Sequence, residues 1–200
     1  MLTSQERRRR EKQELRQAIL DAAGGLILAC GYEEFSLRRV AERIGYSATT
    51  IYLHFENKDA LLAAVIDEGF GRFLLALQAV DTADPLERIA DLGRAYVRFG
   101  QENCVYYQLM FMQRADLLKL EPCELPEDQT GTFAILVDAV KRALDAGALR
   151  PGDPEALSLV LWAAMHGIVA LAVTMPHLDD VTIARTTELM LDALGRSMRS

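Results

Sequence analysis

The most informative part of the sequence is the segment from Ser36 to Lys58, SLRRVAERIGYSATTIYLHFENK. Ser36 precedes apolar residues with helical spacing, and its hydroxyl can accept from the free N–H groups of a helix start. Gly45 follows them, where a left-handed glycine ends a helix at little cost. Ser47 is placed to cap a second helix, which is predicted to run from Ala48 to His54. Two short helices joined by a tight turn with a glycine form a helix-turn-helix.

The second helix of such a unit enters the major groove of DNA, and its outward residues here are small, hydroxylated or aromatic. Arg38, in the first helix, can reach a guanine edge or a phosphate. Asn57 can cap a third helix, which would present Lys58 and free N–H groups to a phosphate. A plain pair of core helices would not gather these basic and aromatic residues around one short helix. The outward residues of the second helix are Ala48, Thr49, Thr50, Tyr52 and His54.

The same segment closely resembles the DNA-binding signature of the TetR (tetracycline repressor-like) family of transcriptional regulators, over residues 15–65. The resemblance implies that some of these side chains read bases, namely Arg38, Ala48 and Thr49. It implies phosphate contacts for Thr50, Tyr52, His54 and Lys58. An alanine at position 48 offers only an apolar contact. The residues that carry the resemblance are Gly31-Tyr32, Phe35 to Leu37, Gly45, Ser47, Ile51 to Phe55, Asn57-Lys58 and Leu61-Leu62.

The net charge of −7 is unevenly distributed along the chain. Residues 1–60 hold ten Lys and Arg against nine Asp and Glu, a net of +1, whereas residues 61–200 hold twelve against twenty, a net of −8. Charges more than about 10 Å apart are largely screened at ordinary salt. An acidic second part therefore does not prevent the first part from binding DNA.

Composition and pattern predict an all-α chain, because prolines are few and no long alternating strands occur. We expect an N-terminal three-helix domain with the helix-turn-helix, residues 1–60. A long helix from Asp59 to about Ala79 would join it to a C-terminal helical domain, residues 61–200, for which the resemblance implies ligand binding and dimerisation. Later helices are expected at about 85–103, 128–146, 154–175 and 181–198.

The segment from Leu157 to Met175 is nearly uncharged over a length that could span a bilayer. Its acidic flanks and its internal polar residues argue against a membrane span. A helix that is apolar on all sides is buried, and a second subunit is the expected cover. The resemblance implies a homodimer joined by the last two helices. The interface residues expected there are Leu157, Leu161, Ile168, Leu189, Met190 and Leu194.

Aromatic and methionine residues of the second part are candidates for an effector pocket, which the resemblance implies in this domain. Trp162 to Gly167 also resembles a Trp-His-Gly signature in one group of the family's C-terminal domains. For any single residue the alternative is ordinary core, and for His166 a bond to a backbone carbonyl. The candidates are Tyr96, Phe99, Tyr107, Met110, Phe111, Phe133, Trp162, Met165 and His166.

Two further features leave alternatives open. The basic run Arg7 to Arg10, with Lys12, is either a solvated helix start or a DNA contact. The three cysteines form no metal-binding or C-x-x-C spacing, and we expect a reducing cytoplasm. Cys123, in a polar loop, is the cysteine expected to be the most reactive.

The sequence holds no phosphate loop, serine elbow, metal cluster or Cys–His arrangement, so we expect no catalysis, cofactor or metal. The resemblance implies a cytoplasmic, homodimeric, ligand-responsive regulator of transcription. It would act as a repressor that binds a near-palindromic DNA operator and is released by a small, mainly apolar effector. The alternatives are an activator of the same family, or a non-catalytic helical interaction module with a vestigial helix-turn-helix.

Overall fold

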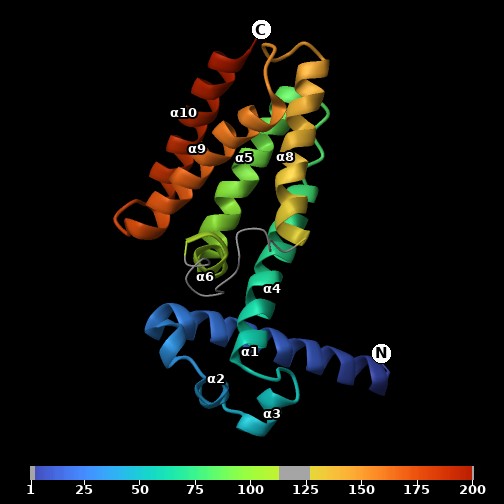
Figure 1. Cartoon of the computed structure of the whole chain (residues 1–200), viewed down its shortest axis with the longest axis vertical. Helices are drawn as coiled ribbons and strands as arrows, with labels where there is room; N and C mark the ends of the chain where they lie inside the picture. The colour runs from blue at the N-terminus through green and yellow to red at the C-terminus, as the bar shows by residue number, and fades with distance from the viewer. Residues whose placement is uncertain (1–2, 113–126, 200) are drawn as a thin grey trace. The chain divides into compact units, whose positions relative to one another are not determined.

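The computed structural model describes residues 3–112 and 127–199 (Figure 1). Within these ranges the regular elements are helices joined by turns and loops, and an isolated β-bridge pairs Leu149 with Arg199. The predicted all-α fold is confirmed. The elements are α1 (Ser4–Glu34), α2 (Leu37–Ile44), α3 (Ala48–Tyr52), α4 (Lys58–Gln78), α5 (Pro85–Glu102), α6 (Cys104–Tyr107), the π-helical turn η1 (Gln108–Met112), α8 (Glu127–Asp145), α9 (Pro154–Thr174) and α10 (Asp180–Met198).

The chain divides into two compact units. The first holds the residues up to Gly69 and the described residues from Val105 to Met112, and the second holds 70–104 and the described residues from 127 onward. The division falls inside α4, between Gly69 and Phe70, so one unbroken helix contributes to both units. The functional division expected after residue 60 stays a prediction.

Local hydrogen bonds cap α2, α3 and α4 as the sequence predicts. Ser36 Oγ accepts from the N–H of Arg39 at 3.3 Å, and Ser47 Oγ accepts from that of Thr50 at 3.2 Å. Gly45 ends α2 with φ 74°, the left-handed region that glycine tolerates. A side-chain cap of this kind stabilises a helix by about 1 kcal/mol. The short helix-turn-helix therefore carries its own end signals.

The second helix of the motif is shorter than predicted. It ends at Tyr52, not at His54, because the N–H groups of His54 and Phe55 both donate to the carbonyl of Ile51 at 2.9 Å. This tightened last turn directs Phe55 into the interior, where only 7% of its surface is exposed. Ile51 itself is fully buried. Both predicted inward residues of α3 and its following turn are therefore in the core.

The first unit packs α1, α2, α3 and the start of α4 around one apolar core. Fully buried residues come from each of these helices, among them Ile19, Val40, Ile51 and Leu61. Gly31 has φ 78° and interrupts the helical geometry of α1 near its end. The last residues of α1 thus change direction before α2 begins (Figure 1).

In the second unit, α5, α8, α9 and α10 pack together. Asp84 caps α5 by accepting from the N–H groups of Leu86 and Glu87, and Pro85 begins the helix, as predicted. Asp153 and Pro154 begin α9 in the same way. Gly100 lets α5 approach α9 closely, since a Cβ at this position would collide with the side chain of Val169.

Helix α9 is long and apolar enough to cross a membrane, with a mean hydropathy of 2.1 over its most apolar window, of which 28% is buried. Length and composition alone are weak evidence for a span, because core and interface helices share them. Much of the helix is exposed within this single chain. Its exposed apolar side chains include Leu159, Val160 and Leu171.

Candidate nucleic-acid interface

Helix α3 exposes the side chains that the sequence assigns to base and phosphate contact. Thr49 is exposed, Ala48 and Thr50 are half-exposed, and Tyr52 is 59% exposed. The Thr50 hydroxyl lies 2.9 Å from that of Ser47, so it takes part in the cap of its own helix. Thr49 has no such local bond. Of the two threonine hydroxyls of α3, that of Thr49 is therefore the better placed for an outside partner.

Two exposed apolar side chains beside α3 were not singled out from the sequence. Tyr46, in the turn between α2 and α3, is 51% exposed, and Leu53, after α3, is 81% exposed. Large exposed apolar groups on a small domain commonly mark an interaction surface. Tyr46 lies in the turn before α3, and Leu53 lies just after the observed end of α3, although the predicted helix included it.

Arg38 is already paired in the structure. Its Nε lies 3.2 Å from Glu42 Oε1, one turn further along α2, and both side chains are mostly exposed. An exposed pair of this kind contributes little to stability, typically below about 1 kcal/mol. A base or phosphate that replaces Glu42 as the partner of Arg38 therefore needs to overcome only a small cost.

Lys58 begins α4, and its ammonium group is held over an aromatic ring. Asn57 Oδ1 accepts from the N–H of Ala60 at 2.8 Å, which caps the helix as predicted. The Nζ of Lys58 lies 4.2 Å from the centre of the Tyr32 ring, a cation–π contact. A positive side chain and the N-terminal end of a helix thus coincide, an arrangement that favours an anion.

His54 lies among positive charges. Its pKa is lowered, first by partial burial and then by the charges of Lys12 and Arg16 on α1. Arg16 itself lies over the Phe55 ring, with its guanidinium carbon 5.5 Å from the ring centre. At neutral pH His54 is therefore uncharged, and a contact to phosphate would use its N–H as a donor.

The basic run Arg7 to Arg10 is helical, because α1 begins at Ser4. Thr3 and Glu6 form a reciprocal capping box at its start. All side chains from residue 3 to residue 14 are exposed. The run is thus the beginning of a helix and not an extended arm. Cys123, the other feature left open, lies outside the described residues.

The predicted effector-pocket residues fall in both units. Tyr107, Met110 and Phe111 belong to the first, and the others to the second. In the second unit Trp162 Nε1 donates to Tyr96 Oη at 3.0 Å, and that oxygen lies 3.2 Å from His166 Nδ1. Burial lowers the pKa of His166 and favours the neutral ring. The Trp162 ring also lies 6.0 Å from that of Phe133. Three helices, α5, α8 and α9, thus contribute to one aromatic cluster.

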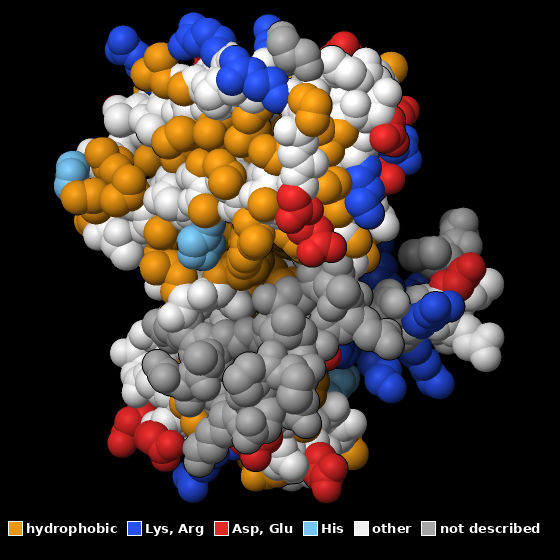
Figure 2. Space-filling model, turned by 45° about the horizontal axis from the view of Figure 1, so that its top comes forward, with side chains coloured by type: hydrophobic (Ala, Val, Ile, Leu, Met, Phe, Trp, Pro, Cys, Tyr) orange, Lys and Arg blue, Asp and Glu red, His pale blue; other side chains and the backbone are white. Residues whose placement is uncertain are grey.

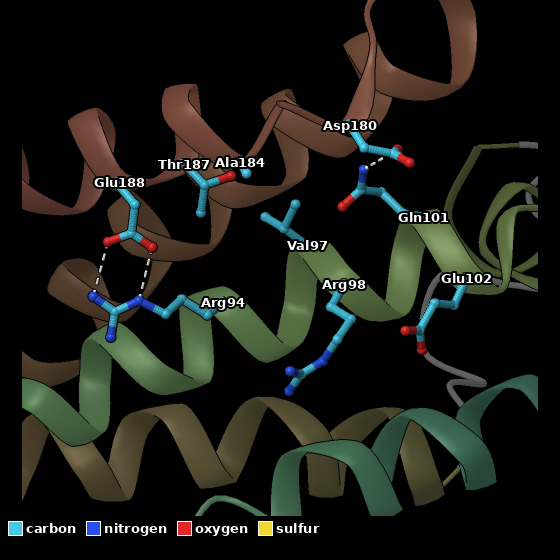
Figure 3. Close-up of a pocket in the computed structure, with 9 residues that line it drawn as sticks. All are labelled: Arg94, Val97, Arg98, Gln101, Glu102, Asp180, Ala184, Thr187 and Glu188. Carbon is cyan, nitrogen blue, oxygen red and sulfur yellow. Dashed lines mark hydrogen bonds and ion pairs between the residues drawn. The ribbon is translucent and has the colours of Figure 1, made fainter. Parts of the chain in front are cut away.

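A separate groove of about 510 Å³, lined by several charged residues, lies between α5 and α10 (Figure 3). Arg94 donates to Glu188 through Nε and Nη2 at 2.8 and 2.9 Å, and Gln101 donates to Asp180 at 3.0 Å. These hydrogen bonds raise the pKa of Arg94 and lower that of Glu188. None of its lining residues is among the predicted effector contacts. The lining consists of Arg94, Val97, Arg98, Gln101, Glu102, Asp180, Ala184, Thr187 and Glu188.

The six residues predicted at a subunit interface differ in exposure. Leu189 is 60% exposed, and Leu157, Met190 and Leu194 are half-buried. Leu161 and Ile168 are buried within the chain itself. Other large apolar residues of α9 and α10 are exposed and were not singled out. These are Leu159, Val160, Leu171, Met175 (the residue that follows α9) and Val181.

Two family models match the chain. Residues 19–65 match the family described as bacterial regulatory proteins, tetR family, and residues 89–194 match a tetracyclin repressor-like C-terminal domain. The HTH-type transcriptional regulator RutR of Escherichia coli K12 is 28% identical over 173 residues, which cover 84% of this chain and 78% of RutR.

Solved structures are also similar. A protein of unknown function from Rhodococcus sp. RHA1 is 28% identical with a TM-score of 0.76, and the match covers 93% of this chain and 96% of that one. A complex of SmeT with triclosan is 26% identical with a TM-score of 0.66, and covers 92% and 91% of the two chains. Both matches extend over the two compact units.

Proposed function

Because the chain belongs to the TetR family of bacterial transcriptional regulators, we propose that it is a cytoplasmic homodimeric repressor released by a small apolar effector. The observation that carries the proposal is the capped helix-turn-helix. It exposes Thr49 and Tyr52 on α3 and holds Lys58 at the start of α4. Two copies of α3 in a dimer would read the half-sites of a near-palindromic operator, about one duplex turn apart.

The proposed contacts fall into two groups, those to base edges and those to phosphates. Arg38, Ala48 and Thr49 would contact base edges, with the Thr49 methyl and hydroxyl groups as the main source of direct readout. Thr50, Tyr52, His54 and Lys58 would contact phosphates and fix the register of the protein on the duplex. The small side chain of Ala48 would add an apolar contact alone.

Exposed apolar surface on α9 and α10 supports the homodimer. Figure 2 shows hydrophobic side chains gathered on the face of the second unit that is turned toward the viewer. On α10, Val181 is 75% exposed and Leu189 60% exposed, and α9 exposes about half of Leu159 and Leu171. Contiguous exposed apolar surface on a soluble chain is unstable unless a partner covers it. A second copy would cover it in a symmetric contact.

The aromatic cluster of the second unit supports a mainly apolar effector. Tyr96, Phe133 and Trp162 supply ring surface, and His166 supplies a neutral polar group. Such sites typically combine apolar walls with a few directed polar groups. SmeT, a related protein, is known in complex with triclosan, an instance of the ligand class we propose here.

Release would follow from a shift in conformational populations. An effector that binds one conformer more tightly shifts the equilibrium only by that difference in affinity. If the favoured conformer spaces the two copies of α3 wrongly for the operator, DNA affinity falls. A tenfold loss requires a difference of about 1.4 kcal/mol.

The proposal is tested by fluorescence anisotropy with labelled duplexes that tile the DNA beside the gene of the protein. A random duplex and several salt concentrations provide the comparison. We expect selective binding to one duplex, with one dimer per site. Equal binding to all duplexes would contradict a sequence-specific regulator of its own locus. Trp162 is the single tryptophan of the chain, so its fluorescence reports candidate effectors directly.

A further inference from the structure

We propose that Arg9, Lys12 and Arg16, on one face of α1, form a phosphate-binding strip that follows the DNA backbone outside each half-site. The inference rests on the proposed DNA-binding function and extends it to a part of the chain outside the helix-turn-helix. The strip would add affinity without sequence preference, because phosphates are the same at every base pair.

The inner end of the strip is fixed beside the recognition helix. Arg16 lies over the ring of Phe55, which is three residues beyond the end of α3. Lys12 and Arg16 also lie close enough to His54 to lower its pKa. The strip therefore starts where the proposed phosphate contacts of His54 and Tyr52 end.

Helical spacing places the three cations on one face. At about 100° per residue, positions 9, 12 and 16 fall within roughly 60° of one another around the helix axis. The acidic residues Glu11 and Glu14 fall on the other side, where Arg10 pairs with Glu14 at 2.7 Å. Glu6 lies one turn before Arg9, at the edge of the strip, and its carboxylate accepts from the N–H of Thr3 at 2.6 Å. The strip thus presents three positive charges with no carboxylate of α1 between them.

The strip is accessible and long enough for a backbone. Arg9, Lys12 and Arg16 are exposed, and within the described residues none of them forms an ion pair. At about 1.5 Å per residue, Arg9 lies roughly 10 Å beyond Arg16 along the axis, the length of about three base pairs. In Figure 1 the N-terminal end of α1 extends past α2 and α3, and Figure 2 shows Lys and Arg side chains around it.

The chemistry of this face favours a nucleic acid over a membrane surface. A helix that lies on a membrane needs large apolar residues beside its basic ones. Beside the strip, Gln5, Arg8 and Gln13 are polar or charged and exposed, and the nearest large apolar residue, Leu15, is half-buried. Duplex DNA requires only the positive charges and their spacing.

The test compares two variants of equal charge change. Arg9→Ala/Lys12→Ala removes two cations from the strip, and Arg7→Ala/Arg10→Ala removes two from the other side of the same helix turns. Both are exposed positions, and circular dichroism checks that each variant keeps the helical content of the wild type. Affinity for a random duplex and for the selected operator is measured by anisotropy at several salt concentrations.

The strip variant should lose affinity equally on both duplexes, on the order of tenfold at low salt. Its plot of log affinity against log salt should be flatter by about 1.8, for two lost phosphate contacts. The control should stay close to the wild-type slope. Equal salt slopes for the strip variant and the control variant would contradict a phosphate-binding role of the strip. If the wild-type protein binds all duplexes equally, the proposed sequence-specific regulator is contradicted. The strip would still be tested in that case, by the salt dependence of binding to the random duplex.

Discussion

Lys58 and Tyr32 come together across the first unit, with the ammonium nitrogen 4.2 Å from the centre of the ring. Tyr32 belongs to the last residues of α1, after the interruption at Gly31, and Lys58 is the first residue of α4. A side chain with many rotamers is thus restrained at the point where we propose a phosphate contact. Restraint before binding lowers the entropy lost on binding.

Replacement of Lys58 tests this contact. Lys58→Ala should weaken binding to operator and random duplex alike and flatten the salt slope by about one unit. Tyr32→Leu should reproduce part of that loss, whereas Tyr32→Phe, which keeps the ring face, should not. The measurement is anisotropy against salt. If Tyr32→Leu weakens DNA binding by the same factor in the Lys58→Ala variant as in the wild type, the ring does not act through Lys58.

Thr49→Ala should change sequence preference more than overall affinity. The methyl and hydroxyl groups of Thr49 are exposed on α3, and loss of a base contact typically costs about 1–3 kcal/mol at the matching base pair only. The check is affinity for a panel of operators with single base-pair changes. Thr50→Ala serves as the comparison, since its hydroxyl lies against Ser47. Equal losses on operator and random duplexes would remove Thr49 from base readout.

A charge at Leu189 should separate the proposed dimer. Leu189→Glu places a carboxylate at a residue that is 60% exposed in one chain and would be covered in the proposed dimer. Burial of an unpaired charge costs several kcal/mol. Sedimentation should then give monomers. Leu75→Glu, at a residue of α4 that is 67% exposed, is the matched control and should remain dimeric. A dimeric Leu189→Glu would place the interface elsewhere.

Gly100→Ala should destabilise the second unit. The added methyl group would meet the side chain of Val169, and overpacking of this kind typically costs about 1–3 kcal/mol. Gly71→Ala is the control, because no atom lies within 4 Å of a Cβ built there. Alanine in an open helical position stabilises by up to about 1 kcal/mol. The melting temperature should therefore fall for Gly100→Ala and rise for Gly71→Ala. Equal shifts of the two melting temperatures would contradict the close approach of α5 and α9.

The bridge between Arg94 and Glu188 should make part of the stability depend on pH. The hydrogen bonds from Arg94 lower the pKa of Glu188 below its usual value of 4.5. The folded state therefore releases the proton of Glu188 more readily than the unfolded state. The ion pair stabilises the fold fully at pH values above the usual pKa of 4.5. Its contribution is lost as the pH falls through the lowered pKa.

Glu188→Gln should accordingly melt at a lower temperature than the wild type at pH 7. The two should converge below the usual pKa of glutamate, and the difference at neutral pH should stay below about 1 kcal/mol because the pair is partly exposed. Asp192→Asn is the control, since Asp192 pairs with Arg196 inside α10 and not between helices. A difference between Glu188→Gln and the wild type that does not vary with pH would exclude the proposed titration.

The local signals of the sequence were sufficient for the helix starts. Ser36, Ser47, Asn57 and Asp84 all cap the helices they were expected to cap. Such caps depend on residues two or three positions apart, so the sequence contains the whole interaction. The early end of α3 at Tyr52 was not predictable in this way, because it depends on the burial of Phe55 in the core.

Contacts between distant segments were harder to predict. Helix α9 is apolar on nearly all sides, so no helical period distinguishes the buried Leu161 from the exposed Val160. The groove beside Arg94 and Glu188 joins residues that are 94 positions apart. The restraint of Lys58 by Tyr32 has the same origin. Each depends on tertiary packing that propensity and spacing do not specify.

The end signals of α2 and α3 have a consequence for how such a protein diversifies. Ser36, Gly45 and Ser47 hold the helix ends, and Ile51 holds α3 in the core, so neither the caps nor this core contact use the side chains of Ala48 and Thr49. After a gene duplication, one copy can therefore accumulate changes at these two positions while it keeps its fold. If these two positions read bases as we propose, new operator preferences become accessible by single substitutions.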